Sequence, residues 1–158
     1  MKSVMRLAFF GLLFTGGAYA QSQGTPAWYV TSSTDKGATA MDVGRLERKE
    51  DVAVAMSALY FVVPQQGKDG PVDFIQTLDA YDCSVPSRTR TIIGEGYRVG
   101  QYEPVFKFRD DQAPWKTYGE KSPGMLAWLT ACKGPNPQTL LPDLETHEQV
   151  LDLVRKQK

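Results

Sequence analysis

The familiar hydrolase mechanisms would in this chain have to use its single histidine, His147. Hydrolases of the Ser-His-Asp or Cys-His kind need such an imidazole as their base. His147 stands between Thr146 and Glu148 in a polar C-terminal segment, so we expect it on the solvated face of a helix. A lone histidine beside acids also lacks the converging nitrogen or sulfur ligands of a metal site. The sequence therefore predicts no catalytic residue, no metal and no cofactor.

Two short motifs look like catalytic or phosphate-binding signatures but lack the required context. Ser33 and Lys36 match the Ser-x-x-Lys pattern of acylating serine enzymes, yet they lie in a predicted turn without the companion motifs. The segment Gly94–Gly100 resembles a phosphate-binding glycine loop, but its last interval is one residue too long and no helix follows. We interpret it as a hairpin turn that needs positive φ angles. Asp110 and Asp111 lack the spacing of a calcium loop.

Basic residues form the clearest candidate for binding. Arg88 and Arg90 share one face of a predicted strand because their positions differ by two. Arg98, Lys107 and Arg109 follow in neighbouring segments. If these side chains align, they form a basic surface suited to a sulfated sugar, an acidic peptide or another protein; the alternative is an ordinary solvated sheet face. The candidate site is thus Arg88, Arg90, Arg98 and Lys107, with a protein or a polyanionic sugar as partner.

The N-terminal segment has the pattern of a secretory signal peptide. Lys2 and Arg6 precede an apolar run that ends in the small residues around Ala18 and Ala20. We predict that residues 1–20 are a signal peptide cleaved near Ala20, and that the protein is exported to the periplasm or secreted. The apolar run is too short to span a bilayer. No cysteine follows Ala20, so we expect neither a transmembrane segment nor a lipid anchor.

Charge and size narrow the class of protein further. Residues 1–20 hold two of the 18 basic residues and none of the 18 acidic ones, so cleavage leaves 16 against 18 and a net charge of −2. Such a balance creates no overall field that would recruit nucleic acid. The remaining length is that of one domain with one core. We place that domain at residues 21–134, followed by a linker and C-terminal helix at 135–158.

Cys83 and Cys132 are the two cysteines of the chain. In an oxidising compartment such a pair most often forms a disulfide, although two buried thiols would also satisfy the sequence. Cys83 ends a predicted strand and Cys132 lies on a predicted helix. The bond would therefore join sheet to helix.

Apolar and alternating segments predict an antiparallel meander, with strands at 28–30, 39–47, 52–63, 72–83, 88–93 and 102–108. The run 52–63 is almost continuously apolar, which is typical of a central strand covered on both faces. The mixed pattern of 72–83 predicts a bulge or burial on both faces. We expect a loop at 64–71, because it is rich in Gly, Pro and charged residues.

Two helices are predicted near the C-terminus. Ser122 is a good N-cap with Pro123 at the first helical position, and Met125, Trp128, Leu129 and Cys132 share a face. The segment 143–155 is amphipathic, with Thr146 and Gln149 spaced as a capping box; it either docks or frays. The fold class is therefore α+β: an antiparallel meander packed against a short disulfide-tied α-helix, with a C-terminal amphipathic helix.

Three of these segments carry a family resemblance: Trp28–Val30, Tyr81–Cys83 followed by the arginine-rich strand, and Ser122–Gly124 leading to Cys132. On these residues the chain resembles the surface-adhesin protein E family of Gram-negative bacteria, over residues 27–133. The resemblance implies an antiparallel sheet packed against a helix, with adhesion to host matrix proteins as the best-described activity. The chain departs from the family in lacking a lipobox cysteine and in its tail from Pro135 onward, and no binding residue is carried over.

The sequence thus predicts an exported, non-enzymatic binding or interaction protein. The alternative is a periplasmic structural or inhibitor-like envelope protein that acts through its loops. A hydrolase is the third hypothesis.

Overall fold

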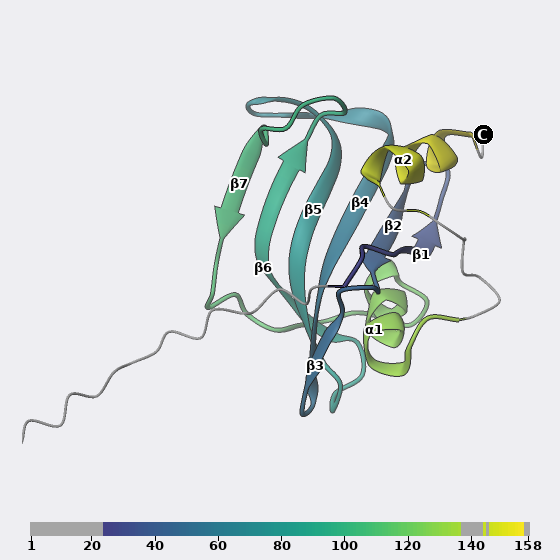
Figure 1. The fold of residues 1–158 in the computed structure, drawn as a ribbon. Coiled ribbons are helices and arrows are strands. Elements are labelled where there is room, and N and C mark those ends of the chain that lie inside the picture. The colour runs from purple at the N-terminus through teal and green to yellow at the C-terminus, as the bar shows by residue number, and fades with distance from the viewer. Residues whose placement is uncertain (1–23, 137–143, 145, 157–158) are drawn as a thin grey trace, which may run out of the picture.

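One antiparallel sheet dominates the molecule (Figure 1). The computed structural model describes residues 24–136, 144 and 146–156, which form eight strands and two helices. The strands are β1 (Trp28–Ser33), β2 (Gly37–Asp42), β3 (Glu47–Lys49), β4 (Val52–Gly67), β5 (Gly70–Asp82), β6 (Arg88–Tyr97), β7 (Phe106–Arg109) and β8 (Lys116–Thr117). The helices are α1 (Pro123–Lys133) and α2 (His147–Lys156).

The strand order is that of a meander with two additions. Neighbours run β1-β2-β4-β5-β6-β7, while β3 pairs with β4 and β8 with β6. Every pair is antiparallel. The antiparallel sheet and both helices were predicted, but the molecule is mostly β and matches the α+β class only loosely.

The apolar segment 52–63 forms the middle of the sheet, as predicted. β4 lies between β2 and β5. On one face, Ala58 and Tyr60 belong to a core cluster that contains residues of α2. On the other face, Ala53 and Ala55 belong to a cluster that contains residues of α1. We call these the α2 face and the α1 face; burial on both explains why the segment lacks a polar alternation.

The β4–β5 hairpin is longer than predicted. The expected loop at 64–71 is wrong, because β4 continues to Gly67, β5 begins at Gly70, and only Lys68 and Asp69 lie between them. Pro64 falls where the β4–β5 register shifts. A proline is tolerated at such an irregularity because no ladder hydrogen bond needs its missing N–H.

A second irregularity lies between β5 and β6. For the segment 72–83 we predicted a bulge or burial on both faces, and β5 shows the second, because the successive residues Val72, Asp73 and Phe74 are buried, while the bulge itself is on β6. Leu78 pairs with Ile93, whereas Asp79 pairs with Thr91, so Ile92 is the extra residue on β6. Successive side chains along a strand point to opposite faces. The bulge therefore sets which residues of β6 share a face with Asp79.

The glycine segment 94–100 was predicted as a turn, and this is largely wrong. Gly94 and Gly96 lie inside β6, where the rings of Phe108 and Phe106 cover them so closely that a Cβ would collide. These two glycines therefore make room for cross-strand aromatic rings. Only Gly100, with φ of 78°, occupies a turn conformation that favours glycine.

The predicted strand 39–47 is divided in two. β2 ends at Asp42 and β3 begins at Glu47. The carboxylate of Asp42 is fully buried and accepts hydrogen bonds from the backbone N–H groups of Ala27 (2.9 Å) and Gly44 (3.1 Å) and from Arg45. The bonds from Gly44 and Arg45 are local, and they turn the chain away from a continuous strand.

α1 begins and ends as predicted and is tied to the sheet by a disulfide. The Ser122 hydroxyl accepts from the Met125 backbone N–H (3.2 Å), and Gly134 follows the last residue. Cys132 is bonded to Cys83, just after β5, with an S–S distance of 2.05 Å. The Trp128 indole N–H donates to the Asp82 carbonyl (2.7 Å). The predicted apolar face is partly wrong, because Leu129 is 37 % exposed.

α2 docks on the sheet instead of fraying. Its start is the predicted capping box, in which the Thr146 hydroxyl accepts from the Gln149 backbone N–H (3.2 Å) and the Gln149 side-chain Oε1 accepts from the Thr146 backbone N–H (3.0 Å). Val150, Leu151 and Val154 are buried in the cluster that contains Tyr60. The C-terminal helix thus shares the core of the predicted 21–134 domain.

The predicted signal peptide at 1–20 lies outside the described residues. Within the described part of the chain, neither helix is long and apolar enough to cross a membrane. Figure 1 shows α1 and α2 near β1, β2 and β4, away from β7 at the far edge.

Candidate functional site

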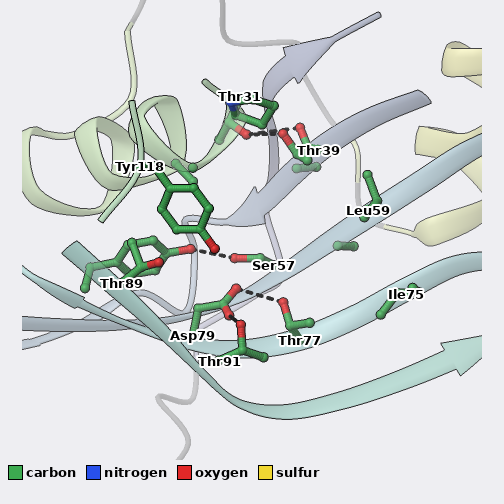
Figure 2. Close-up of a pocket in the computed structure, with 16 residues that line it drawn as sticks. Thr31, Thr39, Ser57, Leu59, Ile75, Thr77, Asp79, Thr89, Thr91 and Tyr118 are labelled. Carbon is green, nitrogen blue, oxygen red and sulfur yellow. Dashed lines mark hydrogen bonds between the residues drawn. The ribbon is translucent and has the colours of Figure 1, made fainter. Parts of the chain in front are cut away.

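Hydroxyl side chains from several strands line a hollow of about 250 Å³ on the α1 face (Figure 2). We call it the hydroxyl pocket. Its polar lining is Thr31, Thr39, Ser57, Thr77, Asp79, Tyr81, Thr89, Thr91 and Tyr118; its other lining residues are Ala40, Ala58, Leu59, Ile75, Pro123, Gly124 and Ala127. The pocket therefore combines a polar floor with apolar walls.

Strand register brings the polar floor together. Ser57 pairs with Thr77 across β4 and β5, and Asp79 pairs with Thr91 across β5 and β6. Side chains of directly opposed residues lie on the same face, close enough to interact. Because the β6 bulge falls beside Asp79, Thr91 faces the carboxylate instead of the opposite side of the sheet.

Asp79 is the centre of the floor. The Thr77 hydroxyl donates to one carboxylate oxygen and the Thr91 hydroxyl to the other, each at 2.7 Å. Beside them, the Ser57 and Tyr81 hydroxyls are hydrogen-bonded to each other at 2.9 Å. Burial raises the pKa of Asp79, and the surrounding hydroxyls oppose that rise. Burial also raises the pKa of Tyr81, with the Asp79 charge adding to the effect.

Tyr118 and the first turn of α1 form the rim. The Tyr118 backbone is fixed to Ser87, whose hydroxyl donates to the Tyr118 carbonyl (2.6 Å) and accepts from the Tyr118 N–H (3.1 Å). The Tyr118 ring lies over Gly124, and a Cβ at that position would collide with the ring. Figure 2 shows the Tyr118 ring reaching over the pocket toward Ser57. A side chain at position 124 would displace this ring.

A second hollow of about 390 Å³ adjoins the hydroxyl pocket. The two share Ile75, Thr77, Thr89, Thr91 and Tyr118, and the second continues toward β7 and the loop after it. The α1 face is therefore open from Thr39 on β2 as far as the β7 edge.

The predicted basic site is distributed along β6 instead of gathered. Arg88 and Arg90, which flank Thr89 in the sequence, do lie together. Their guanidinium groups are 5.4 and 4.8 Å from the centre of the Trp115 ring. Arg88 also forms an ion pair with Asp82 (3.2 Å). The arginines that were candidates for binding thus hold the chain segment that carries Trp115 against β6.

Arg98 and Lys107 lie elsewhere. Arg98 follows the end of β6, so ten residues of extended chain separate it from Arg88, a distance of about 30 Å. Lys107 pairs with Glu95, near Arg98. The four basic residues therefore make two groups, and a binding role for either group remains a prediction.

The expectation that His147 is solvated is wrong. Its ring lies among those of Phe74 (4.5 Å between centres), Trp28 (4.6 Å) and Tyr60 (5.9 Å), and its Nδ1 is 2.7 Å from the Tyr60 hydroxyl. Burial, aided by the nearby charge of Arg45, lowers the pKa of His147 to about 4. The histidine thus belongs to the packing of α2 on the sheet.

His147 also borders a groove of about 450 Å³ on the α2 face. Phe74, Tyr97, Arg98 and Tyr102 line other parts of it. Phe74 and Tyr97 stack at 5.3 Å, whereas Tyr102 is 99 % exposed. The groove is separate from the hydroxyl pocket, which opens on the other face.

Comparison with protein-family models, with curated proteins and with solved structures finds no match for this chain. In the described ranges, no three His, Cys, Asp or Glu side chains are grouped so that they could hold a metal ion.

Sequence reasoning missed the hydroxyl pocket. A signal was present: Thr77, Asp79 and Tyr81 alternate along one strand, and Thr89 and Thr91 alternate along the next. Such period-two polar residues indicate a polar strand face. What the alternation could not show is that the two strands align these residues opposite each other.

Proposed function

We propose that this chain is an exported, non-enzymatic binding protein that holds its ligand in the hydroxyl pocket. The observation that carries the proposal is a concave site with a polar floor and apolar walls, placed on paired strands. Binding sites commonly combine apolar walls with a few converging polar groups. Side chains fixed on strands also hold a ligand with less loss of conformational freedom than side chains on loops.

The composition of the pocket favours binding over catalysis. Asp79 is the one carboxylic acid among the described residues that line it, and each of its oxygens already accepts a threonine hydroxyl. In nucleophilic catalysis a nucleophile is commonly activated by a second group, an adjacent general base. His147 cannot be the second, since it packs on the α2 face.

The sequence supplies the support for export and for adhesion in this proposal. The Cys83–Cys132 disulfide is compatible with an oxidising compartment, which agrees with the signal-peptide pattern of residues 1–20. The resemblance to the surface-adhesin protein E family supports a protein partner, whereas the predicted polyanionic sugar rests on the basic residues Arg88, Arg90, Arg98 and Lys107. The pocket would then accept one side chain of a protein partner.

Filling the pocket tests the proposal. Leu59 is 39 % exposed and lines the hydroxyl pocket, so the variant Leu59→Trp should occlude it. Val63 is 60 % exposed, lies farther along β4 and does not line the pocket, which makes Val63→Trp the matched control. We expect binding, measured by calorimetry against a panel of amines, acids, sugars and a heparin-like polymer, to be lost only in Leu59→Trp.

Two results would overturn the proposal. One is ligand binding that Leu59→Trp leaves intact, because the ligand would then occupy another surface. The other is turnover of ester, glycoside or peptide substrates that disappears in Asp79→Asn, because the carboxyl would then be catalytic.

A second candidate function is inhibition of an envelope enzyme through a loop. It rests on the segment between β6 and β7, where Tyr102 is 99 % exposed and Val99 is 42 % exposed. Exposed aromatic residues on loops are typical anchors of protein recognition. Tyr102→Ala should weaken such an interaction at least tenfold and leave ligand binding in the hydroxyl pocket unchanged.

A further inference from the structure

The hydrogen bonds around Asp79 determine what the pocket can recognise. An ionised carboxylate only accepts hydrogen bonds, so Thr77 and Thr91 must donate their single hydroxyl protons to it. Their remaining lone pairs are then the groups available to a ligand. Around Asp79 the floor therefore presents acceptors and a negative charge, which favours a ligand that donates hydrogen bonds.

No cation within the pocket neutralises that charge. Neither lysine nor arginine is among the described residues that line it. The ion pairs of the neighbouring strands involve Asp82 and Asp73 instead. Burial raises the pKa of Asp79, which is the effect expected of a carboxylate that lacks a counter-ion. A ligand that supplied the positive charge would relieve this penalty.

The walls and rim suit an aliphatic stem. Leu59 and Ile75 stand opposite each other on β4 and β5, and both line the pocket. At the rim, the face of an aromatic ring such as Tyr118 attracts a cation. An ammonium group on an alkyl chain would therefore meet acceptors at its charged end and apolar surface along its stem.

We propose that the hydroxyl pocket binds a primary ammonium group carried on an aliphatic stem, with Asp79 as its counter-ion. The inference rests on the proposed function and specifies the class of ligand. A lysine side chain of a partner protein and a free alkylamine share this chemistry. They differ in whether backbone atoms beyond the stem add to the affinity.

Calorimetry with small probes tests the charge. We expect n-butylammonium to bind at neutral pH and both 1-butanol and butyrate to bind at least tenfold more weakly, since they have the same stem without the positive charge. Asp79→Asn should reduce n-butylammonium binding at least tenfold. The matched control is Asp111→Asn, which removes the charge of an exposed aspartate paired with Arg109 outside the pocket, and it should change nothing.

A second variant protects the test against misfolding of Asp79→Asn. Leu59→Trp keeps the carboxylate and fills the pocket, so it too should abolish n-butylammonium binding. Nα-acetyl-lysine N-methylamide, which keeps its side-chain ammonium group, distinguishes the two sources. Tighter binding of this probe than of n-butylammonium indicates a protein partner, and equal binding indicates a free amine.

The outcomes separate this inference from the proposed function. Equal binding of 1-butanol, or unchanged binding in Asp79→Asn, would overturn the ammonium class while the pocket remains a binding site. The ammonium class would also be overturned, and the pocket kept as a binding site, if n-butylammonium does not bind and another probe does bind and is blocked by Leu59→Trp. If the whole panel fails to bind the wild type, both proposals are wrong.

Discussion

The two faces of the sheet are covered in different ways. On the α2 face, a helix held by non-covalent contacts buries Val150, Leu151 and Val154 together with Tyr60 and Phe74. On the α1 face, a helix bonded covalently through Cys132 covers the small residues Ala53 and Ala55 and leaves a hollow beside it.

This difference shows how a small domain can keep a polar pocket. A helix without a covalent link must bury apolar surface to stay attached, because that burial is its main source of stability. A disulfide lowers the entropy of the unfolded chain and therefore stabilises the helix–sheet contact without filling the face. The α1 face is thus able to hold threonines and a carboxyl group where apolar packing would otherwise be needed.

Removal of the disulfide should have the largest effect. The bond spans 49 positions, and closing a loop of that length corresponds to about 4 kcal/mol in the chain-entropy account. We expect the double variant Cys83→Ala and Cys132→Ala to lose about this much free energy of unfolding in urea titrations. A loss below about 1 kcal/mol would mean that non-covalent contacts suffice to hold α1 on the sheet, and the contrast between the two faces would then fail.

Truncation in α2 should cost nearly as much. Leu151 is fully buried, and Leu→Ala at such a position typically costs about 3 kcal/mol. Leu129→Ala in α1 is the matched control, since Leu129 is 37 % exposed and should cost less than about 1 kcal/mol. Equal losses in the two variants would show that both helices depend on packing to the same extent.

Acidification should weaken the α2 face selectively. The pKa of His147 is about 4 in the folded protein and about 6.5 when unfolded. As the pH falls below 6.5, the unfolded chain gains the proton first, so stability that is fully present above pH 6.5 is lost between pH 6.5 and 4. The loss is about 3 kcal/mol. Urea titrations at pH 7.5 and 4 should show that the wild type loses this much more free energy of unfolding than His147→Asn does. An equal loss in the two proteins would contradict the prediction.

Asp79→Asn should have the smallest effect and the opposite sign. Burial raises the pKa of Asp79, so the negative charge is less favourable in the folded state than in the unfolded chain, and ionisation lowers stability. Removing the charge should therefore leave the melting temperature at pH 7 unchanged or slightly raised. Asp82→Asn is the control and should slightly lower it, because Asp82 pairs with Arg88. A marked loss in Asp79→Asn would assign the carboxyl a structural role.

Glycines and histidine show where sequence reasoning fails. Gly94 and Gly96 suggested a turn because glycine adopts positive φ angles, but they lie in β6 to admit the rings of Phe108 and Phe106. His147 suggested a solvated position because its sequence neighbours are polar, yet it contacts Tyr60, 87 positions away. In both cases the partner that decides the outcome lies on another element.

The sequence by itself determined the local features of this protein. The Ser122 cap, the Thr146–Gln149 capping box and the burial of β4 depend on residues a few positions apart, and two cysteines allow a single intramolecular bond. Only the tertiary structure decided the hydroxyl pocket. Its floor requires that the β6 bulge fall at Ile92, so that Thr91 meets Asp79. Such a register depends on the pairing of whole strands, and no short segment encodes it.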